Sequence, residues 1–144
     1  MNFPSTSSDP GRATDGKLHS DPISQLSYLA LGDSYTIGEG VEEHGRWPML
    51  LAQGLREAGI AIADPRIIAT TGWTTDELSA AMDAAEPLRR WDFVSLLIGV
   101  NNQYRGRPID EYRAELRELL VTAVDLAGGA ARNVVVLSIP DWGV

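Results

Sequence analysis

Four short runs of apolar residues recur along the chain, and each has the length of a buried strand. They span residues 27–31, 66–69, 93–98 and 134–137, and the first and third are followed by a glycine. Strands of a parallel sheet are covered on both faces, so they are apolar almost throughout instead of alternating. The pattern therefore predicts four buried parallel strands.

The segments between these runs carry apolar residues at helical spacing. Residues 46–59 have a proline in the expected first turn and end at a glycine. Residues 74–85 open with Thr74-Thr-Asp-Glu77, a capping box whose first and last side chains satisfy each other's backbone amides. Residues 108–127 begin at a proline and are followed by two glycines. Three amphipathic helices are predicted.

The alternation of strands and helices predicts the fold class. It indicates an α/β domain over residues 26–144, a three-layer, doubly wound (flavodoxin-like) parallel sheet with helices on both faces. Ligands of such sheets bind at the carboxyl ends of the strands, so the residues that follow each strand are the candidates for function. Residues 1–25 are rich in Ser, Asp, Pro and Gly without apolar periodicity, and we expect a disordered tail there.

Composition and charge narrow the classes of function. The formal net charge of -8 argues against a nucleic-acid partner, because phosphate binding needs clustered Lys and Arg. The absence of cysteine excludes disulfides, thiolate catalysis and cysteine-based zinc sites. No stretch has the apolar length of a signal peptide, or the roughly 20 residues of a membrane span. We therefore expect a cytoplasmic protein without a membrane span.

Three residues that could carry chemistry follow the first three strands. Ser34 lies in Gly-Asp-Ser after the first strand, Gly72 follows the second, and Asn101 follows the third. Each has a plain structural alternative that is favoured when the residue is taken alone: a capping turn for Ser34, a turn glycine, and an asparagine that bonds its own turn. Together they converge on one edge of the sheet. Acyl transfer needs such a set, a nucleophile with several donors aimed at one oxygen.

The segments around these residues resemble one family. ALGDSYTIGEG, ATTGWTTDEL and LLIGVNNQYRG, in this order, are similar to the blocks of the SGNH (GDSL-type) hydrolases, which are serine esterases and lipases. The resemblance covers residues 27–144. One departure is Asn102, where many members have Asp.

The resemblance implies a role for each of the three residues. Ser34 would be the nucleophile. Its own backbone N–H, the N–H of Gly72 and the side-chain amide of Asn101 would form the oxyanion hole. Asp33, next to the nucleophile, is expected to support the turn and not to serve as the acid of the triad.

The family's general base is not found in the sequence. In the family, base and acid come from an Asp-x-x-His segment near the C-terminus, and no such segment occurs in this chain. The histidines are His19, in the tail, and His44, which follows two glutamates in a polar loop. We therefore expect a piece of a longer protein that lacks the last strand and helix of the fold and is inactive alone.

These observations predict a carboxylic ester hydrolase that acts through a covalent acyl-enzyme on Ser34, with a small-molecule ester as substrate and no metal or organic cofactor. Short acyl esters, acetylated sugars, lysophospholipids and thioesters stay open as substrates, and so does the oligomeric state. The alternative is a catalytically silent module that binds a small ligand on the same sheet. Arg105 fits either an anion-binding role or, as the favoured interpretation, a surface salt bridge.

Overall fold

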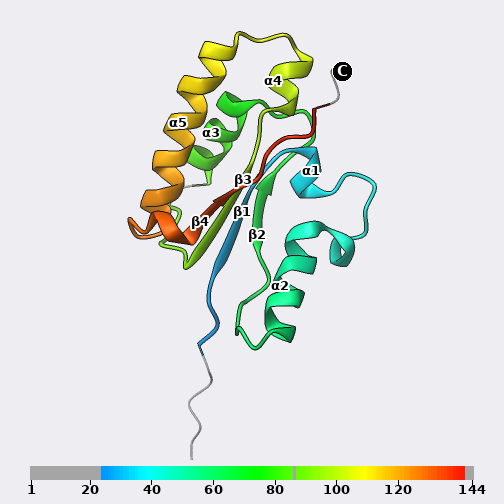
Figure 1. Ribbon diagram of the computed structural model, residues 1–144, viewed down its shortest axis with the longest axis vertical. Helices are drawn as coiled ribbons and strands as arrows, with labels where there is room; N and C mark the ends of the chain where they lie inside the picture. Colours follow the sequence, from blue (N-terminus) through cyan, green and yellow to red (C-terminus); the bar gives the residue numbers. More distant parts are fainter. Residues whose placement is uncertain (1–23, 86, 142–144) are drawn as a thin grey trace, which may run out of the picture.

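A computed structural model describes residues 24–85 and 87–141 of the chain, so most of the predicted tail lies outside the described residues. The described part forms strands, helices and two short 3₁₀ turns (Figure 1). The elements, in chain order, are β1 (Tyr28–Gly32), α1 (Ser34–Ile37), η1 (Glu43–Gly45), α2 (Trp47–Glu57), β2 (Arg66–Ala69), α3 (Thr75–Ala84), β3 (Phe93–Leu97), α4 (Val100–Tyr104), α5 (Ile109–Leu126), η2 (Ala131–Asn133) and β4 (Val134–Val136).

The four strands form one parallel sheet in the order β2-β1-β3-β4. The prediction of four parallel strands is confirmed, and the bounds differ from the expected ones by one residue at most. β1 lies inside the sheet, where its carboxyl end at Gly32 pairs with Ala69 of β2 and Leu97 of β3. The residues that follow these three strands therefore emerge side by side at one edge of the sheet.

Helices cover both faces of the sheet, as expected for a doubly wound fold (Figure 1). Alternate residues of β1 enter two separate cores, because successive side chains of a strand point to opposite faces. Leu29 and Leu31 belong to the larger core under α3 and α5. Tyr28 and Ala30 belong to a smaller core that includes Ala52 of α2. The three-layer architecture follows from these two cores.

The predicted helices are present, and the capping box at the start of α3 is formed as expected. The backbone N–H of Thr74 donates to the Glu77 carboxylate over 2.9 Å. The pattern did not predict the short helices α1 and α4. Each has only four or five residues, too few for an apolar stripe to repeat.

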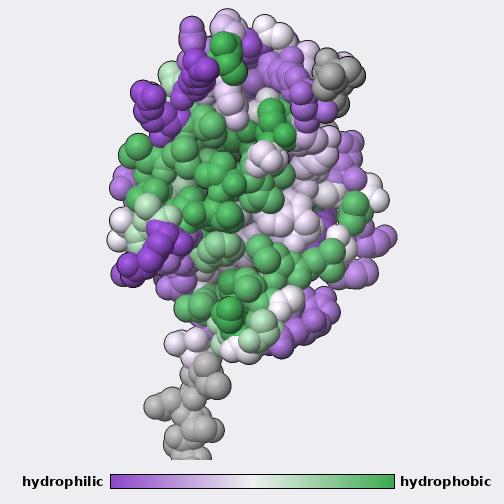
Figure 2. Space-filling view, viewed as in Figure 1, coloured by the Kyte–Doolittle hydropathy of each residue, from purple (hydrophilic) through white to green (hydrophobic). Residues whose placement is uncertain are grey.

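Within the described residues, β4 is the outermost strand on its side of the sheet. Val135 and Val136 are 39% and 47% exposed. Hydrophobic side chains gather over this edge, between α5 and α2 (Figure 2). An exposed apolar edge of this kind favours pairing with another strand.

Candidate active site

Ser34 is held at the carboxyl end of β1 by a sharp strand-to-helix turn. It is the first residue of α1, and Asp33 caps that helix by accepting a hydrogen bond from the N–H of Tyr35 over 3.0 Å. The helix ends one turn later at Gly38, whose N–H donates to the carbonyl oxygen of Ser34. This closed turn fixes the serine backbone and leaves Ser34 only partly buried.

Asp33 supports this turn, as the sequence predicted. Its side chain is fully buried, and within the described residues one carboxylate oxygen, Oδ2, has no hydrogen-bond partner. Burial raises the pKa of the Asp33 carboxyl above its usual value, because the charged form loses its hydration. The capping bond to Tyr35 opposes part of this effect.

Gly72 lies in the loop between β2 and α3 with a φ of 88°, a left-handed conformation that a side chain disfavours. Its carbonyl oxygen accepts a hydrogen bond from Arg105 over 2.6 Å. The same guanidinium forms a salt bridge with Glu77 over 3.1 Å. Arg105 therefore connects α4 to the glycine loop, in agreement with the favoured salt-bridge interpretation.

Asn101 lies in α4, directly after β3. Its Nδ2 donates a hydrogen bond to the carbonyl oxygen of Trp73 over 2.9 Å. An amide NH₂ group has two hydrogens. The bond to Trp73 fixes the orientation of the amide and leaves the second hydrogen for another acceptor.

The three predicted residues line one cavity of about 330 Å³. Ser34 comes from the β1–α1 turn, Gly72 from the β2–α3 loop and Asn101 from α4, so three neighbouring strand ends contribute to it. Tyr35, Tyr104 and Glu39 also contribute to the lining. The residues that carry the candidate hydroxyl, backbone amide and side-chain amide therefore line the same space.

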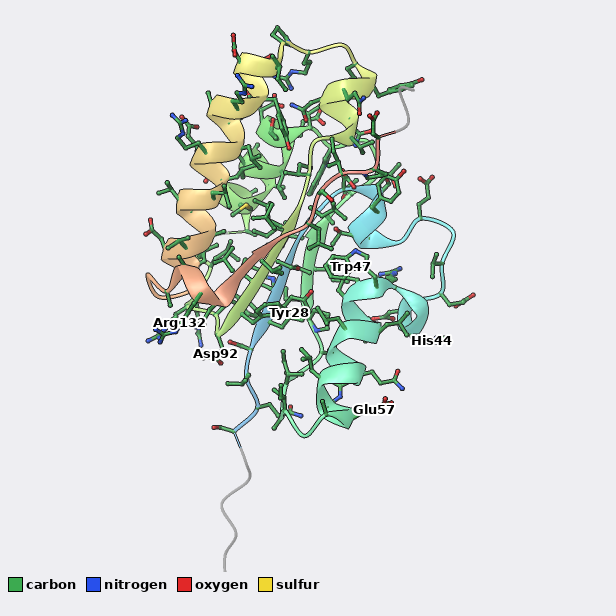
Figure 3. All side chains as sticks on the ribbon, in the orientation of Figure 1. Tyr28, His44, Trp47, Glu57, Asp92 and Arg132 are labelled. Atoms are coloured by element: carbon green, nitrogen blue, oxygen red, sulfur yellow. The ribbon has the colours of Figure 1, made fainter. Side chains whose placement is uncertain are left out.

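No histidine is found among the described residues that line this cavity. His44 lies in η1 ahead of α2, where its side chain is exposed (Figure 3). This agrees with the expectation of a solvated loop. His19 lies outside the described residues.

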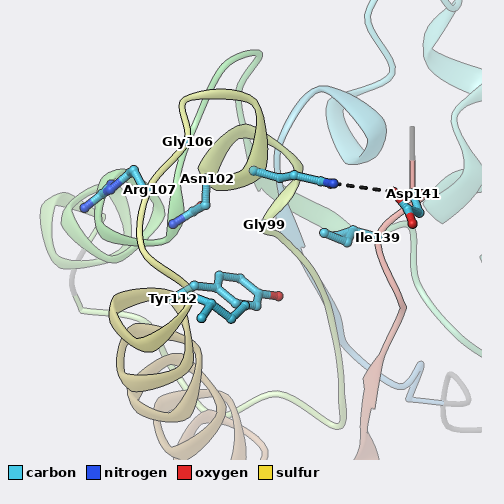
Figure 4. Close-up of a pocket in the computed structure, with 9 residues that line it drawn as sticks. Gly99, Asn102, Gly106, Arg107, Tyr112, Ile139 and Asp141 are labelled. Atoms are coloured by element: carbon cyan, nitrogen blue, oxygen red, sulfur yellow. Dashed lines mark hydrogen bonds between the residues drawn. The ribbon is translucent and has the colours of Figure 1, made fainter. Parts of the chain in front are cut away.

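A second and larger cavity, of about 510 Å³, lies against the opposite side of α4, and nothing in the sequence indicated it (Figure 4). Gly99, Asn102, Tyr112 and Ile139 are among its lining residues. The side-chain amide of Gln103 reaches across to Asp141 over 3.4 Å. The cavity depends on β3, α5 and the segment after β4, which only the tertiary fold brings together.

Asn102, noted above as a departure from the family pattern, is a buried structural residue. Its side chain is 2% exposed and bonds twice to Thr75, at the start of α3. No local pattern predicts this pairing, because the two residues are 27 positions apart.

The contacts of the Glu77 carboxylate with the Thr74 N–H and with Arg105 predict that stability depends on pH. The Thr74 N–H, and then the Arg105 guanidinium, hold the pKa of Glu77 below its usual value. The charged form therefore stabilises the fold above the unfolded pKa of about 4.3, and this contribution is lost as the pH falls through the lower pKa of the folded state. Glu77→Gln keeps a capping acceptor and removes the charge.

We expect Glu77→Gln to lower the free energy of unfolding at pH 7, and the difference from wild type to shrink below about pH 4. Urea unfolding at both pH values measures this difference. Glu118→Gln, on the exposed side of α5, is the matched control and should change little. A difference for Glu77→Gln that is equally large at pH 3 would contradict the assignment to charge.

In the part of the chain that the structure describes, no helix has the length and apolar character needed to cross a membrane. The same residues contain no group of three or more His, Cys, Asp or Glu arranged to hold a metal ion.

Comparisons with solved structures find the same fold. AlinE4, described as an SGNH-hydrolase family esterase, aligns with a TM-score of 0.63 and 24% identity over 80% of this chain and 58% of its own. The psychrotrophic esterase EstA from Pseudoalteromonas sp. aligns with a TM-score of 0.65 and 19% identity over 83% of this chain and 64% of its own. A lipolytic protein of the G-D-S-L family from Veillonella parvula has a TM-score of 0.52 and 18% identity, over 78% and 56% of the two chains.

This chain thus spans less than two thirds of the length of each of these structural neighbours. No curated protein sequence matches it. The model of the GDSL-like Lipase/Acylhydrolase family matches residues 30–144, which include Ser34, Gly72 and Asn101. The chain belongs to the GDSL-like lipase/acylhydrolase family.

Proposed function

We propose that this protein is a carboxylic ester hydrolase in which Ser34 is the nucleophile. The observation that carries the proposal is the shared cavity: Ser34, Gly72 and Asn101 line it together, each from the end of a different strand. A hydroxyl and converging amide donors in one cavity are what acyl transfer requires. Membership of the family supports the same reaction class.

In the proposed reaction, Oγ of Ser34 attacks the carbonyl carbon of the ester and gives its proton to a base. The carbonyl oxygen becomes an oxyanion, which the N–H groups of Ser34 and Gly72 and the free amide hydrogen of Asn101 stabilise. The C–O bond to the alcohol then breaks, and the alcohol leaves with a proton. Water hydrolyses the acyl-serine by the same route, which releases the acid and restores the hydroxyl.

The general base limits what the 144-residue chain does alone. The described lining of the cavity contains no histidine, and a positioned base contributes about 10²–10⁴-fold to such a proton transfer. We propose that the chain alone hydrolyses esters very slowly, and that imidazole added to the solution partly replaces the base.

The lining of the cavity favours a neutral ester as substrate. Glu39 places a carboxylate beside the serine, while Tyr35 and Tyr104 offer aromatic surface. A negatively charged acyl group would be repelled by Glu39. EstA, one of the structural neighbours, is inhibited by monoethylphosphonate. We therefore choose a phosphonylating reagent to probe this site, in a neutral form because of Glu39.

Asn101→Ala tests the oxyanion hole. We expect the substitution to slow covalent modification of Ser34 by an ethyl alkylphosphonofluoridate by up to about 10²–10³-fold, because the phosphoryl oxygen loses a donor as its charge grows. The measurement is the second-order rate of adduct formation by mass spectrometry, with a fixed concentration of imidazole as the external base.

Gln103→Ala, on the opposite side of α4, is the matched control and should leave the rate nearly unchanged. Equal rates for wild type and Asn101→Ala would remove Asn101 from the oxyanion hole. The alternative function, a silent module that binds a small ligand, is favoured if wild type forms no adduct even with imidazole. The absence of a histidine from the described lining is the observation that keeps this alternative open.

A further inference from the structure

The loop that carries Gly72 is bound to α4 at three successive points. The carbonyl oxygen of Gly72 accepts from Arg105, that of Trp73 accepts from Asn101, and Thr75 pairs with Asn102. The two proposed oxyanion donors lie on the two sides of this contact, because the Gly72 amide belongs to the loop and the Asn101 amide belongs to α4. The distance between the donors therefore depends on how the loop and helix are held together.

The bond between Thr75 and Asn102 is the buried member of these three. Thr75 is fully buried and Asn102 is 2% exposed, whereas the Arg105 side chain is 45% exposed. The Thr75 N–H donates to Oδ1 of Asn102 over 3.1 Å, and Nδ2 of Asn102 donates to the Thr75 hydroxyl over 2.8 Å. A reciprocal pair of this kind is stronger and better oriented in a buried environment than at the surface.

The donors and acceptors of this pair are also fixed. Because the Thr75 hydroxyl accepts from Asn102, its own hydrogen is free to donate, and it donates to the carboxylate of Glu115 on α5. Arg107 forms a salt bridge with the other oxygen of Glu115 over 3.4 Å and is bound more closely by Glu111. Hydrogen bonds thus run from the Asn102 amide through the Thr75 hydroxyl to an anchored carboxylate.

We propose that Asn102 is a positioning residue that sets the spacing of the two oxyanion donors through this chain of hydrogen bonds. The proposal rests on the proposed function, since the donors matter only if Ser34 reacts. An amide is required at position 102, because a carboxylate there and Glu115 would compete for the single hydrogen of Thr75. One carboxylate oxygen, either that of residue 102 or that of Glu115, would then face the Thr75 hydroxyl without a donor, and the contact between loop and α4 would loosen.

Asn102→Asp, which conserves shape, tests the proposal together with a compensating variant. We expect Asn102→Asp to slow phosphonylation of Ser34 by about 10–100-fold, since a small displacement of a donor has effects of this size. Glu115→Gln should restore most of the rate in the double variant. A glutamine at 115 can donate to the Thr75 hydroxyl, whose hydrogen then goes to the carboxylate at 102, so every group has a partner.

Gln103→Glu is the matched control, because it makes the same chemical change one residue later, at an exposed side chain that bonds to Asp141 and not to the loop that carries Gly72. It should leave the rate within about twofold of wild type. A purely structural role for Asn102 predicts that Asn102→Asp loses stability but keeps the wild-type rate of phosphonylation. Absence of rescue in the double variant, or a full rate in Asn102→Asp, overturns the proposal.

NMR of the backbone and side-chain amides tests the positioning role of Asn102 independently of the reactivity of Ser34. The amide resonance of Gly72 and the side-chain NH₂ resonances of Asn101 should shift in Asn102→Asp and return in the double variant, whether or not Ser34 reacts. Changes spread evenly over the sheet would contradict a positioning role. Failure of wild-type Ser34 to form an adduct, with these NMR shifts present, rejects the proposed function and keeps the positioning role of Asn102.

Discussion

Ser34→Ala is expected to abolish covalent modification of the chain by an alkylphosphonofluoridate. In wild type, Oγ of Ser34 displaces fluoride from phosphorus, the proton goes to imidazole in the solution, and one phosphonyl group is added to the protein. Alanine has no atom that can form the new bond. Intact-mass spectrometry followed by peptide mapping should find the adduct on Ser34 in wild type and no adduct in the variant.

The geometry around Ser34 is the reason that this serine, and not another, should react. It lies at the first position of α1 and lines the cavity that Gly72 and Asn101 share. In the proposed oxyanion hole, the amide groups of Gly72 and Asn101 would stabilise the charge that develops on the phosphoryl oxygen. An exposed serine elsewhere lacks these donors and should react no faster than serine in a peptide.

Ser79→Ala is the matched control, because Ser79 also lines a surface cavity, beside Asp76 and Asp83 on α3. We expect its adduct yield to equal that of wild type. An adduct that persists in Ser34→Ala would remove Ser34 from the role of nucleophile. Hydrolysis of p-nitrophenyl acetate can be measured with the same two variants. Any rate that wild type shows above that of imidazole alone should be lost in Ser34→Ala and kept in Ser79→Ala.

Gly32→Ala is expected to cause the largest loss of stability of any single methyl addition near the site. Gly32 ends β1, where α1 folds back over it and β3 lies alongside. A Cβ at this position would lie 2.7 Å from the backbone oxygen of Leu97 and 2.6 Å from Cβ of Thr36. Thr36 is fully buried, and Leu97 belongs to the paired strand β3, so neither neighbour can move away without disturbing the sheet.

Such overlap typically costs about 1–3 kcal/mol, and occasionally more. Here a strand must also shift, and we expect a loss of about 3 kcal/mol or more in the free energy of unfolding. That is a large part of the roughly 5–15 kcal/mol that stabilises a typical domain. Urea unfolding followed by circular dichroism measures the loss.

Gly54→Ala is the matched control with an effect of opposite sign. Gly54 lies within α2, and a Cβ there would meet no atom within 4 Å. Alanine in a helix interior is more stable than glycine by about 0.5–1 kcal/mol. A destabilisation by Gly32→Ala no larger than the effect of Gly54→Ala would show that β1 and α1 do not approach as closely as described.

Local pattern was sufficient to predict the strands, the capping box of α3 and the convergence of Ser34, Gly72 and Asn101. Buried parallel strands are apolar throughout, so their places are visible in the sequence. The carboxyl ends of neighbouring strands meet at one edge, so residues that follow them must approach each other once the sheet is parallel. No knowledge of side-chain packing was needed for either inference.

The short helices α1 and α4 were not predicted, although they contain Ser34 and Asn101, two of the three candidate site residues. A helix of one turn has no repeating apolar face, and its formation depends on caps and on contacts with distant segments. For α4 these contacts include the Asn101 bond to Trp73 and the Asn102 pair with Thr75.

The sequence by itself determined which residues become strands, which residues follow them, and which of these can carry acyl-transfer chemistry. These properties follow from the period of apolar residues and from the functional groups that the chain contains. Only the tertiary structure decided the strand order β2-β1-β3-β4, the second cavity beside α4 and the pairing of Asn102 with Thr75. Each of these depends on contacts between residues far apart in the chain, and such contacts leave no local periodicity in the sequence.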